Sequence, residues 1–198
     1  MSEQETWVLA SHNSGKIKEL EALLAPRGIV LKGAAGLGLD EPEETETTFE
    51  GNAALKARAA WSTTGLTSLS DDSGLSVDAL GGAPGVLSAR WAGEPRDFAA
   101  AMRRVHEALL ASGSKDRTAR FVCVVALCRE DGEVRHFRGE VEGEIVWPPR
   151  GEGGFGYDAI FQPAGHDRTF AEMTAAEKRA MSHRGRALAA LLAAEFGR

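Results

Sequence analysis

Two adjacent aspartates are the residues best suited to chemistry in this 198-residue sequence. Asp71 and Asp72 precede Ser73 and Gly74, directly after a short apolar stretch, residues 66–70, that favours a strand. Neighbouring carboxylates repel each other unless a positive charge compensates them, and Mg²⁺ is a natural compensator. A carboxylate here could also act as a general base toward water. A plain turn is the alternative, because Asp, Ser and Gly are common turn residues.

A polar segment between a predicted strand and a predicted helix has the features of an anion-binding loop. Its residues are, in order, Ser11, His12, Asn13, Ser14, Gly15 and Lys16. A loop in this position points backbone N–H groups and the positive end of the helix toward an anion. Gly15 allows close backbone approach, and Lys16 adds a positive charge. The spacing differs from that of a standard P-loop, and a serine-capped helix with a solvated lysine is the alternative.

An acidic loop precedes the next predicted helix. It contains the glutamates Glu41, Glu43, Glu44 and Glu46. Acidic loops are usually just solvated, but one or two of these carboxylates could ligate a hard cation. Asn52 and Lys56 follow at a spacing of four and therefore share a helix face. That face could line the same site, or it could be an ordinary polar surface.

An aromatic segment and a basic segment lie in the last third of the chain. The first consists of Phe155, Gly156, Tyr157 and Asp158, and the second contributes Lys178, His183 and Arg184. Two rings around a glycine could stack on a nucleobase, while Asp158 hydrogen-bonds its edge. The alternatives are that both rings pack into the core and that the basic residues form a solvated surface.

The elements that must position these residues alternate between strands and helices. Apolar runs predict strands at residues 7–10, 29–31, 66–70 and 121–128. Helical spacing predicts helices at residues 17–24, 48–61, 98–110 and 184–196, with Asp97 and Ser182 as caps. Residues 137–145 alternate between apolar or small and charged types, which indicates a strand with one wet face, antiparallel to its neighbour. The pattern predicts an α/β fold with a mixed sheet, in which ligands bind beyond the strand ends.

Composition excludes several classes of protein. The net charge of −6 argues against nonspecific nucleic-acid binding, and no apolar run approaches the roughly 20 residues of a membrane span. Residues 1–6 are polar, which predicts a flexible tail and neither a signal nor a transit peptide. Cys123 and Cys128 fit no metal or redox motif, so we expect buried thiols in a reducing compartment. The prediction is a single soluble, cytoplasmic domain over residues 1–198.

Taken together and in this order, the motifs resemble the inosine triphosphate pyrophosphatase family, the non-standard purine NTP pyrophosphatases. The matching stretches are residues 11–16, 43–45, 48–49, 52–53, 56–57, 71–75, 77–86, 88–90, 154–158, 171–173, 178, 182–184 and 187–188. They span nearly the whole chain, and their combination is highly specific. The resemblance implies an elongated, two-lobed, mixed α/β fold with the active-site cleft between the lobes, and a homodimer.

The resemblance also implies a reaction. Family members hydrolyse ITP, dITP and XTP to the monophosphate and pyrophosphate with Mg²⁺, and so remove deaminated purines from the nucleotide pool. By this resemblance, the residues that hold the triphosphate are Ser11, Asn13 and Lys16, within a loop that also contains His12, Ser14 and Gly15. Lys56 and Ser73 line the phosphate site. Asp72 is the metal-linked general base, and Glu43 or Glu44 helps to hold the cation.

The purine base is assigned by the same resemblance to the second half of the chain. Phe155 and Tyr157, with Gly156 between them, are expected to sandwich the base. The residues expected to read its edge are Asp158, Lys178, His183 and Arg184. The sequence departs from the family at three places: Ser11-His12 replaces the commoner Thr-Gly, Gly51 replaces Glu, and Trp91 replaces Tyr.

Two other functions are compatible with the same residues. The loop containing Gly15 and Lys16 also suits a phosphotransferase that releases the γ-phosphate, and product identity separates the two reactions. A nucleotide sensor without turnover is the third hypothesis. The adjacent aspartates argue against a sensor, because a protein that only binds has less need of two carboxylates there.

Overall fold

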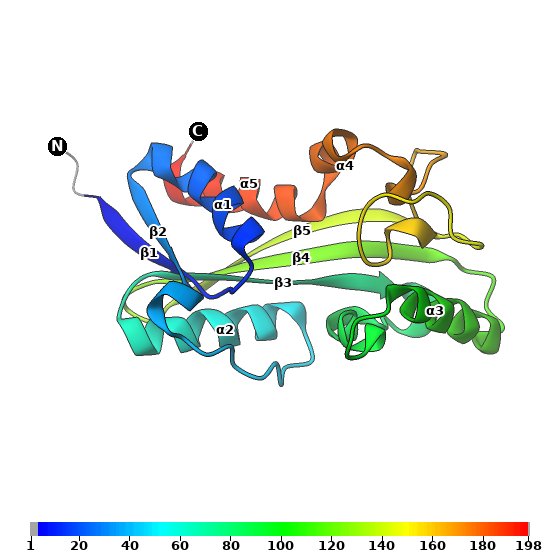
Figure 1. Ribbon diagram of the computed structural model, residues 1–198, viewed down its shortest axis with the longest axis horizontal. Coiled ribbons are helices and arrows are strands. Elements are labelled where there is room, and N and C mark those ends of the chain that lie inside the picture. Colours follow the sequence, from blue (N-terminus) through cyan, green and yellow to red (C-terminus); the bar gives the residue numbers. More distant parts are fainter. Residues whose placement is uncertain (1–3, 198) are drawn as a thin grey trace. The chain divides into compact units, whose positions relative to one another are not determined.

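The computed structural model describes residues 4–197, and its strands and helices alternate as the sequence predicts as far as residue 128 (Figure 1). The strands are β1 (Glu5–Leu9), β2 (Ile29–Gly33), β3 (Ser68–Val77), β4 (Thr118–Cys128), β5 (Val134–Ile145) and β6 (Phe161–Pro163). The helices are α1 (Ser14–Leu24), α2 (Phe49–Thr64), α3 (Phe98–Ser112), α4 (Ala175–Met181) and α5 (His183–Phe196). Short 3-10 helices lie between them, including one at Ala34–Leu37.

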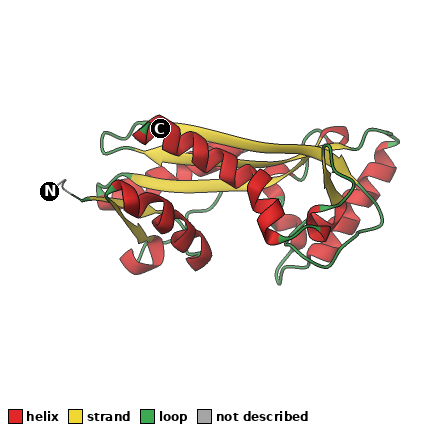
Figure 2. Cartoon of the chain, turned by 90° about the horizontal axis from the view of Figure 1, so that it is seen from above, coloured by secondary structure: helices red, strands yellow, loops and turns green. Residues whose placement is uncertain are grey.

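The strands form one mixed sheet in the order β2-β1-β3-β4-β5-β6, which confirms the predicted fold class. β1 is parallel to β2 and β3, whereas β5 is antiparallel to β6. The alternation predicted for β5 is confirmed, because Phe137, Val141 and Ile145 are buried and the charged residues between them are not. The longest strands are β3, β4 and β5, which belong to the yellow arrows of Figure 2.

The chain divides into two compact units, each built from separate segments. Within the described residues, the first unit consists of residues 4–72, 124–137 and 191–197, and the second of residues 73–123 and 138–190. The boundaries fall inside β3, β4, β5 and α5, so neither unit is a continuous stretch of chain. The single domain expected from the sequence stays a prediction.

The first unit is organised around β1 and β2. Trp7, Val8 and Leu9 are at most 1% exposed, as expected for a strand covered on both faces. Figure 1 shows α1 and α2 on opposite sides of the strands, and α2 turns small residues such as Ala53 and Ala57 toward the interior. The last helical residue, Phe196, stacks on Trp7 with ring centroids 5.9 Å apart.

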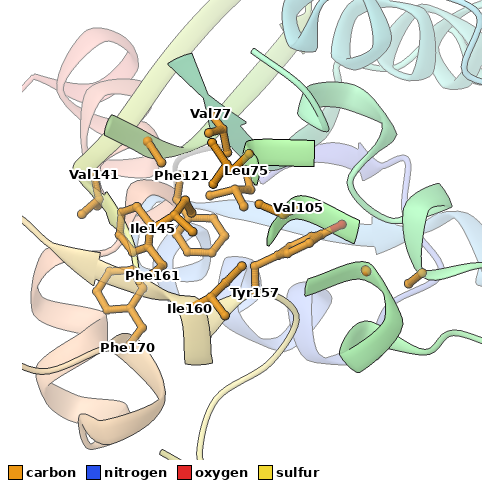
Figure 3. Close-up of a cluster of buried hydrophobic side chains, with 14 of the residues drawn as sticks. Leu75, Val77, Val105, Phe121, Val141, Ile145, Tyr157, Ile160, Phe161 and Phe170 are labelled. Carbon is orange, nitrogen blue, oxygen red and sulfur yellow. The ribbon is translucent and has the colours of Figure 1, made fainter. Parts of the chain in front are cut away.

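The second unit has its own aromatic core, shown in Figure 3. Phe121 lies 4.7 Å from Phe161 and 5.8 Å from Phe170, measured between ring centroids. Tyr157 belongs to the same cluster, and in Figure 3 its ring extends away from the labelled phenylalanines. The predicted cap of α3 is confirmed, because the Asp97 carboxylate accepts the backbone N–H of Ala100 at 2.9 Å.

Three predictions about local structure were wrong. α1 begins at Ser14 rather than near Ile17, since Asn13 caps it and draws the end of the polar loop into the first turn. β3 continues through Asp71 and Asp72 to Val77, because its place beside β4 in the sheet outweighs the local turn preference. The tail expected at residues 1–6 is wrong for Glu5 and Thr6, which belong to β1, and residues 1–3 lie outside the described part.

The expectation of buried thiols agrees with the structure. Both cysteines are buried, and neither forms a disulfide. None of the helices in the described residues combines the length and apolar character needed to cross a bilayer.

Candidate active site

The polar loop before α1 is held by its own side chains. The Ser11 hydroxyl oxygen accepts the backbone N–H of Asn13 at 3.2 Å. The Asn13 side-chain oxygen accepts the N–H groups of Gly15 and Lys16 at 2.9 and 3.2 Å. Asn13 is thus a helix cap in this structure, and a phosphate oxygen would compete with it for two N–H groups. Ser14 and Gly15 are exposed beside it.

Lys16 reaches from α1 to the aspartates on β3. Its ammonium donates to both carboxylate oxygens of Asp71, at 2.8 and 2.9 Å. The sequence suggested positive charge near the aspartate pair, but it did not identify Asp71 as the partner of Lys16. The two residues are 55 positions apart, and only the pairing of β1 with β3 brings their segments together.

Lys56 forms a second pairing between ammonium and carboxylate groups, from the buried side of α2. Its nitrogen lies 2.6 Å from a Glu44 oxygen and 4.0 Å from an Asp72 oxygen. Burial of Lys56 acts to lower its pKa, but the hydrogen bond that it donates to Glu44 and the charges of Asp72 and Asp71 outweigh this effect, so the pKa is raised. Lys56 is therefore a fixed positive charge between two carboxylates.

These residues form one charged cluster in the first unit, which we call the carboxylate–lysine cluster. It consists of Lys16, Glu44, Lys56, Asp71 and Asp72. With two ammonium groups and three carboxylates it carries one excess negative charge. Such a cluster cannot by itself attract a triphosphate, whereas a divalent cation would reverse the sign of its charge.

The donor chemistry of the cluster suits a hard cation. Among the residues that the structure describes, no three carboxylate, imidazole or thiol side chains converge as a ready-made metal site. Mg²⁺ does not require one, because it is usually held by one or two carboxylates together with substrate phosphates and water. Glu44 and Asp72, which flank the same Lys56 ammonium, provide such a pair.

The acidic loop presents its two candidate ligands differently. Glu44 is partly buried against Lys56, whereas Glu43 is exposed on the loop surface. The end of the loop is fixed by Asn52, which is fully buried and accepts the backbone N–H of Glu46 at 3.0 Å. Glycine at position 51, one of the departures from the family pattern, has a steric reason here. A Cβ on Gly51 would lie 2.6 Å from the Glu46 Cβ. The loop could not pack this closely on a larger residue.

The second unit contains the aromatic segment, and its most exposed ring is Phe155, which is 68% exposed. The Asp158 carboxylate holds the backbone of this ring by accepting the Phe155 N–H at 2.7 Å, and it also accepts a hydrogen bond from Lys178. Gly154 has φ +78° and would place a Cβ 2.2 Å from Asp158 Oδ2, so only glycine fits. Asp158 is buried, and its carboxylate binds both the Phe155 backbone and the Lys178 ammonium.

Of the two rings expected to sandwich the base, Tyr157 is the buried one. It is 2% exposed, and its hydroxyl donates to the backbone carbonyl of Ser88 at 2.8 Å. Phe98 packs edge-on against both Phe155 and Tyr157, with centroid distances of 4.8 and 5.7 Å. The exposed stacking surface is therefore Phe155 alone. Phe98 was not identified from the sequence, since nothing local marks a contact with a segment nearly sixty residues away.

The remaining predicted residues have more varied surroundings. Ser73 is half-buried on β3, next to Asp72. His183 and Arg184 are half-buried in the first turn of α5, where His183 stacks on Phe121 at 5.3 Å between ring centroids. Lys178 lies over the Phe170 ring, at 5.3 Å from its centroid. His12 is exposed and contacts the Leu39 carbonyl.

Comparison with known proteins gives consistent matches over almost the whole chain. The profile of the Ham1 family matches residues 7–194. A dITP/XTP pyrophosphatase of Rhizobium meliloti (strain 1021) is 56% identical, with 92% of each chain covered. A solved HAM1 protein from Coxiella burnetii is 46% identical with a TM-score of 0.90, covering 94% of this chain and 96% of that one. A nucleoside-triphosphatase / dITP/XTP pyrophosphatase from Mycobacterium abscessus is 45% identical with a TM-score of 0.83, covering 94% and 98%.

Proposed function

Because the chain belongs to the Ham1 family, we propose that it hydrolyses non-standard purine nucleoside triphosphates, namely ITP, dITP and XTP, to the monophosphate and pyrophosphate. The observation that carries this proposal beyond family membership is the carboxylate–lysine cluster. It combines two fixed ammonium groups, which suit phosphates, with a buried carboxylate, Asp72, that suits a general base. These are the groups that hydrolysis of a phosphoanhydride requires.

In the proposed reaction, Asp72 accepts a proton from the attacking water. The water oxygen forms a bond to the α-phosphorus. The bond from that phosphorus to the oxygen that bridges the α and β phosphates breaks, and pyrophosphate leaves. Lys16 and Lys56 offset the negative charge that builds up on the phosphate oxygens. Both lysines are already ordered by carboxylates, so little reorganisation is needed. Glu44 and Asp72 would hold Mg²⁺, which supplies further positive charge to the triphosphate.

Recognition of the base is assigned to the second unit. Phe155 would stack on the purine, while Lys178, His183 and Arg184 would donate hydrogen bonds to its edge. A donor that faces position 6 favours a keto oxygen and disfavours the amino group of adenine, because the wrong base leaves a buried polar group unpaired. Guanine also carries a 6-keto group, so its rejection must involve the 2-amino position.

Initial rates with a panel of substrates test this proposal. With Mg²⁺ present, kcat/KM for dITP and XTP should exceed kcat/KM for dGTP and dATP by at least about a hundredfold, which lies within the roughly 10⁴- to 10⁵-fold discrimination that unpaired buried polar groups can provide. The Arg184→Ala variant should narrow the ratio of dITP to dGTP while leaving the thermal midpoint nearly unchanged. Equal rates for all four triphosphates would refute the proposed specificity.

We further propose that the protein acts as a cytoplasmic homodimer. Two buried thiols that form no disulfide suit a reducing compartment. Trp147, Leu87 and Leu110 are large apolar side chains that remain exposed on the single chain, as expected where a subunit interface covers them. Light scattering on the purified protein would give the mass directly, and a monomer at micromolar concentration would contradict the dimer.

A further inference from the structure

His12 connects the two loops that supply the carboxylate–lysine cluster. Its Nε2 lies 3.0 Å from the backbone carbonyl oxygen of Leu39. A carbonyl oxygen only accepts, so Nε2 carries the proton and donates it. The other ring nitrogen is 3.9 Å from a Glu41 oxygen, which is too far for a hydrogen bond. The contact with Leu39 therefore joins the polar loop before α1 to the start of the acidic loop.

The acidic loop has little packing of its own where His12 holds it. Residues 38–42 line a cavity of about 220 Å³, together with Lys56 and small residues of α2. Leu39 also donates its N–H to Ala34, which fixes it to the preceding 3-10 helix. Further along, Glu44 is held by Lys56 and Glu46 by Asn52. A cavity below the loop means that hydrogen bonds, rather than side-chain packing, determine its position.

We propose that His12 is a positioning residue that couples the two loops, so that triphosphate binding and Mg²⁺ binding strengthen each other. This inference rests on the proposed function. His12 lies between Ser11 and Asn13, whose side chains order the polar loop, and Leu39 lies five residues before Glu44. A phosphate that settles on the polar loop therefore also fixes the loop that carries Glu44. Glycine, which is commoner at this position in the family, has no side chain to make the contact.

The test compares three variants with the wild type. His12→Ala removes the donor, and His12→Gln keeps an N–H group at a similar distance from the backbone. His136→Ala is the matched control, because His136 is also exposed and lies in the first unit outside the cluster. Calorimetry gives the affinity for a non-hydrolysable dITP analogue with and without Mg²⁺. Hydrogen exchange measures the opening of residues 39–46 in the same samples.

The expected result is a loss of coupling. His12→Ala should bind the metal-free analogue nearly as well as the wild type, while the gain in affinity from Mg²⁺ falls by about three- to tenfold, the range of one net hydrogen bond. Its amides at residues 39–46 should exchange several-fold faster. His12→Gln should restore both properties, and His136→Ala should change neither.

Two outcomes would overturn the proposal. An unchanged Mg²⁺ gain in His12→Ala would show that the loops are not coupled through this residue. An equal loss of affinity with and without Mg²⁺ would make His12 a simple phosphate contact. Failure of the proposed function is distinguishable from failure of this inference. In the first case the wild type would leave dITP and XTP intact, while the hydrogen exchange of residues 39–46 would still report on the contact between His12 and Leu39.

Discussion

At the scale of single residues, two lysines form ion pairs with carboxylates before a substrate binds. Lys16 is paired with Asp71, and Lys56 is paired with Glu44 beside Asp72. A buried lysine without such partners would tend to lose its proton, whereas here the pKa of Lys56 is raised. The pairs keep both ammonium groups charged and oriented. When a triphosphate binds with its cation, the two ammonium groups can exchange their carboxylate partners for phosphate oxygens.

Asp72 gives the first prediction. Asp72→Asn should lower kcat by about 10²- to 10⁴-fold, the usual contribution of a positioned general base, because the amide cannot accept the proton of water. Pyrophosphate release measures the rate, and circular dichroism checks the fold. Asp131→Asn, an exposed aspartate of the first unit, is the control and should keep full activity. Turnover of Asp72→Asn at the rate of the wild type would remove this residue from the mechanism.

Tyr157 gives the second prediction, which tests its burial directly. It is the single tyrosine of the chain, so the phenolate absorbance near 295 nm reports on it alone. Burial raises its pKa from 10.0 to about 12. The folded protein should therefore show little phenolate at pH 10 to 11, whereas the protein unfolded in denaturant should titrate near the ordinary pKa.

The sign of the linked stability follows from that shift. A folded-state pKa above the unfolded value means that the neutral phenol stabilises the fold. This contribution is fully present below pH 10 and is lost as the pH rises through about 12. Titration of Tyr157 near pH 10 in the native protein would instead indicate an exposed ring. It would support the prediction that Phe155 and Tyr157 sandwich the base.

At the scale of elements, the conformation of the acidic loop determines which glutamate can bind the cation. Successive residues of an extended loop point in opposite directions, and here Glu44 faces Lys56 while Glu43 faces solvent. The third prediction is that Glu44→Gln raises the Mg²⁺ concentration for half-maximal rate roughly tenfold, equivalent to about 1.4 kcal/mol. The neighbouring Glu43→Gln variant is the matched control and should change it less than about twofold. Equal effects would mean that the loop rearranges when the cation binds.

The sequence predicts most elements well because their signals are local. The apolar run of β1, the alternation of β5 and the Asp97 cap of α3 all depend on neighbouring residues. The extension of β3 through the aspartates was missed because its place beside β4 in the sheet overrides the turn preference of the residues themselves. α4 was also missed, although Thr174 and Glu177 have the spacing of a capping box and could have revealed it.

The candidate site is predictable in kind but not in its contacts. The patterns identify Lys16, Lys56 and Asp72 as residues for phosphate and metal chemistry. They do not reveal that Asp71 holds Lys16, or that Phe98 supports Phe155, because these pairs depend on the tertiary fold. The same limitation explains Tyr157: an aromatic residue in a glycine-rich loop suits stacking and core packing equally until its burial is known.

At the scale of the whole molecule, each unit is assembled from segments far apart in the chain. In the first unit, the end of α5 returns to the N-terminal strand, where Phe196 stacks on Trp7. The Glu195 carboxylate, whose side chain is 2% exposed, binds both Arg129 and Arg135. The two-lobed arrangement with a cleft, which the family resemblance implies, stays a prediction.

Glu195 gives the fourth prediction. Glu195→Gln should lower the free energy of unfolding by about 2 kcal/mol, because charge-assisted hydrogen bonds to a buried carboxylate are lost. For a chain of this length, that corresponds to a fall in Tm of roughly 4–8 °C. Scanning calorimetry measures the change, with the exposed Glu133→Gln as control. An unchanged Tm would show that this ion pair does not anchor the C-terminal helix.

The measurement that tests the central claim most directly is phosphorus NMR of the purified protein with dITP and Mg²⁺. The account predicts that the triphosphate signals are replaced by those of pyrophosphate and dIMP, with no inorganic phosphate at early times. Signals of dIDP and inorganic phosphate would contradict it, since they would show cleavage at the γ-phosphate. Bound but intact dITP would equally contradict it and would point to a nucleotide sensor.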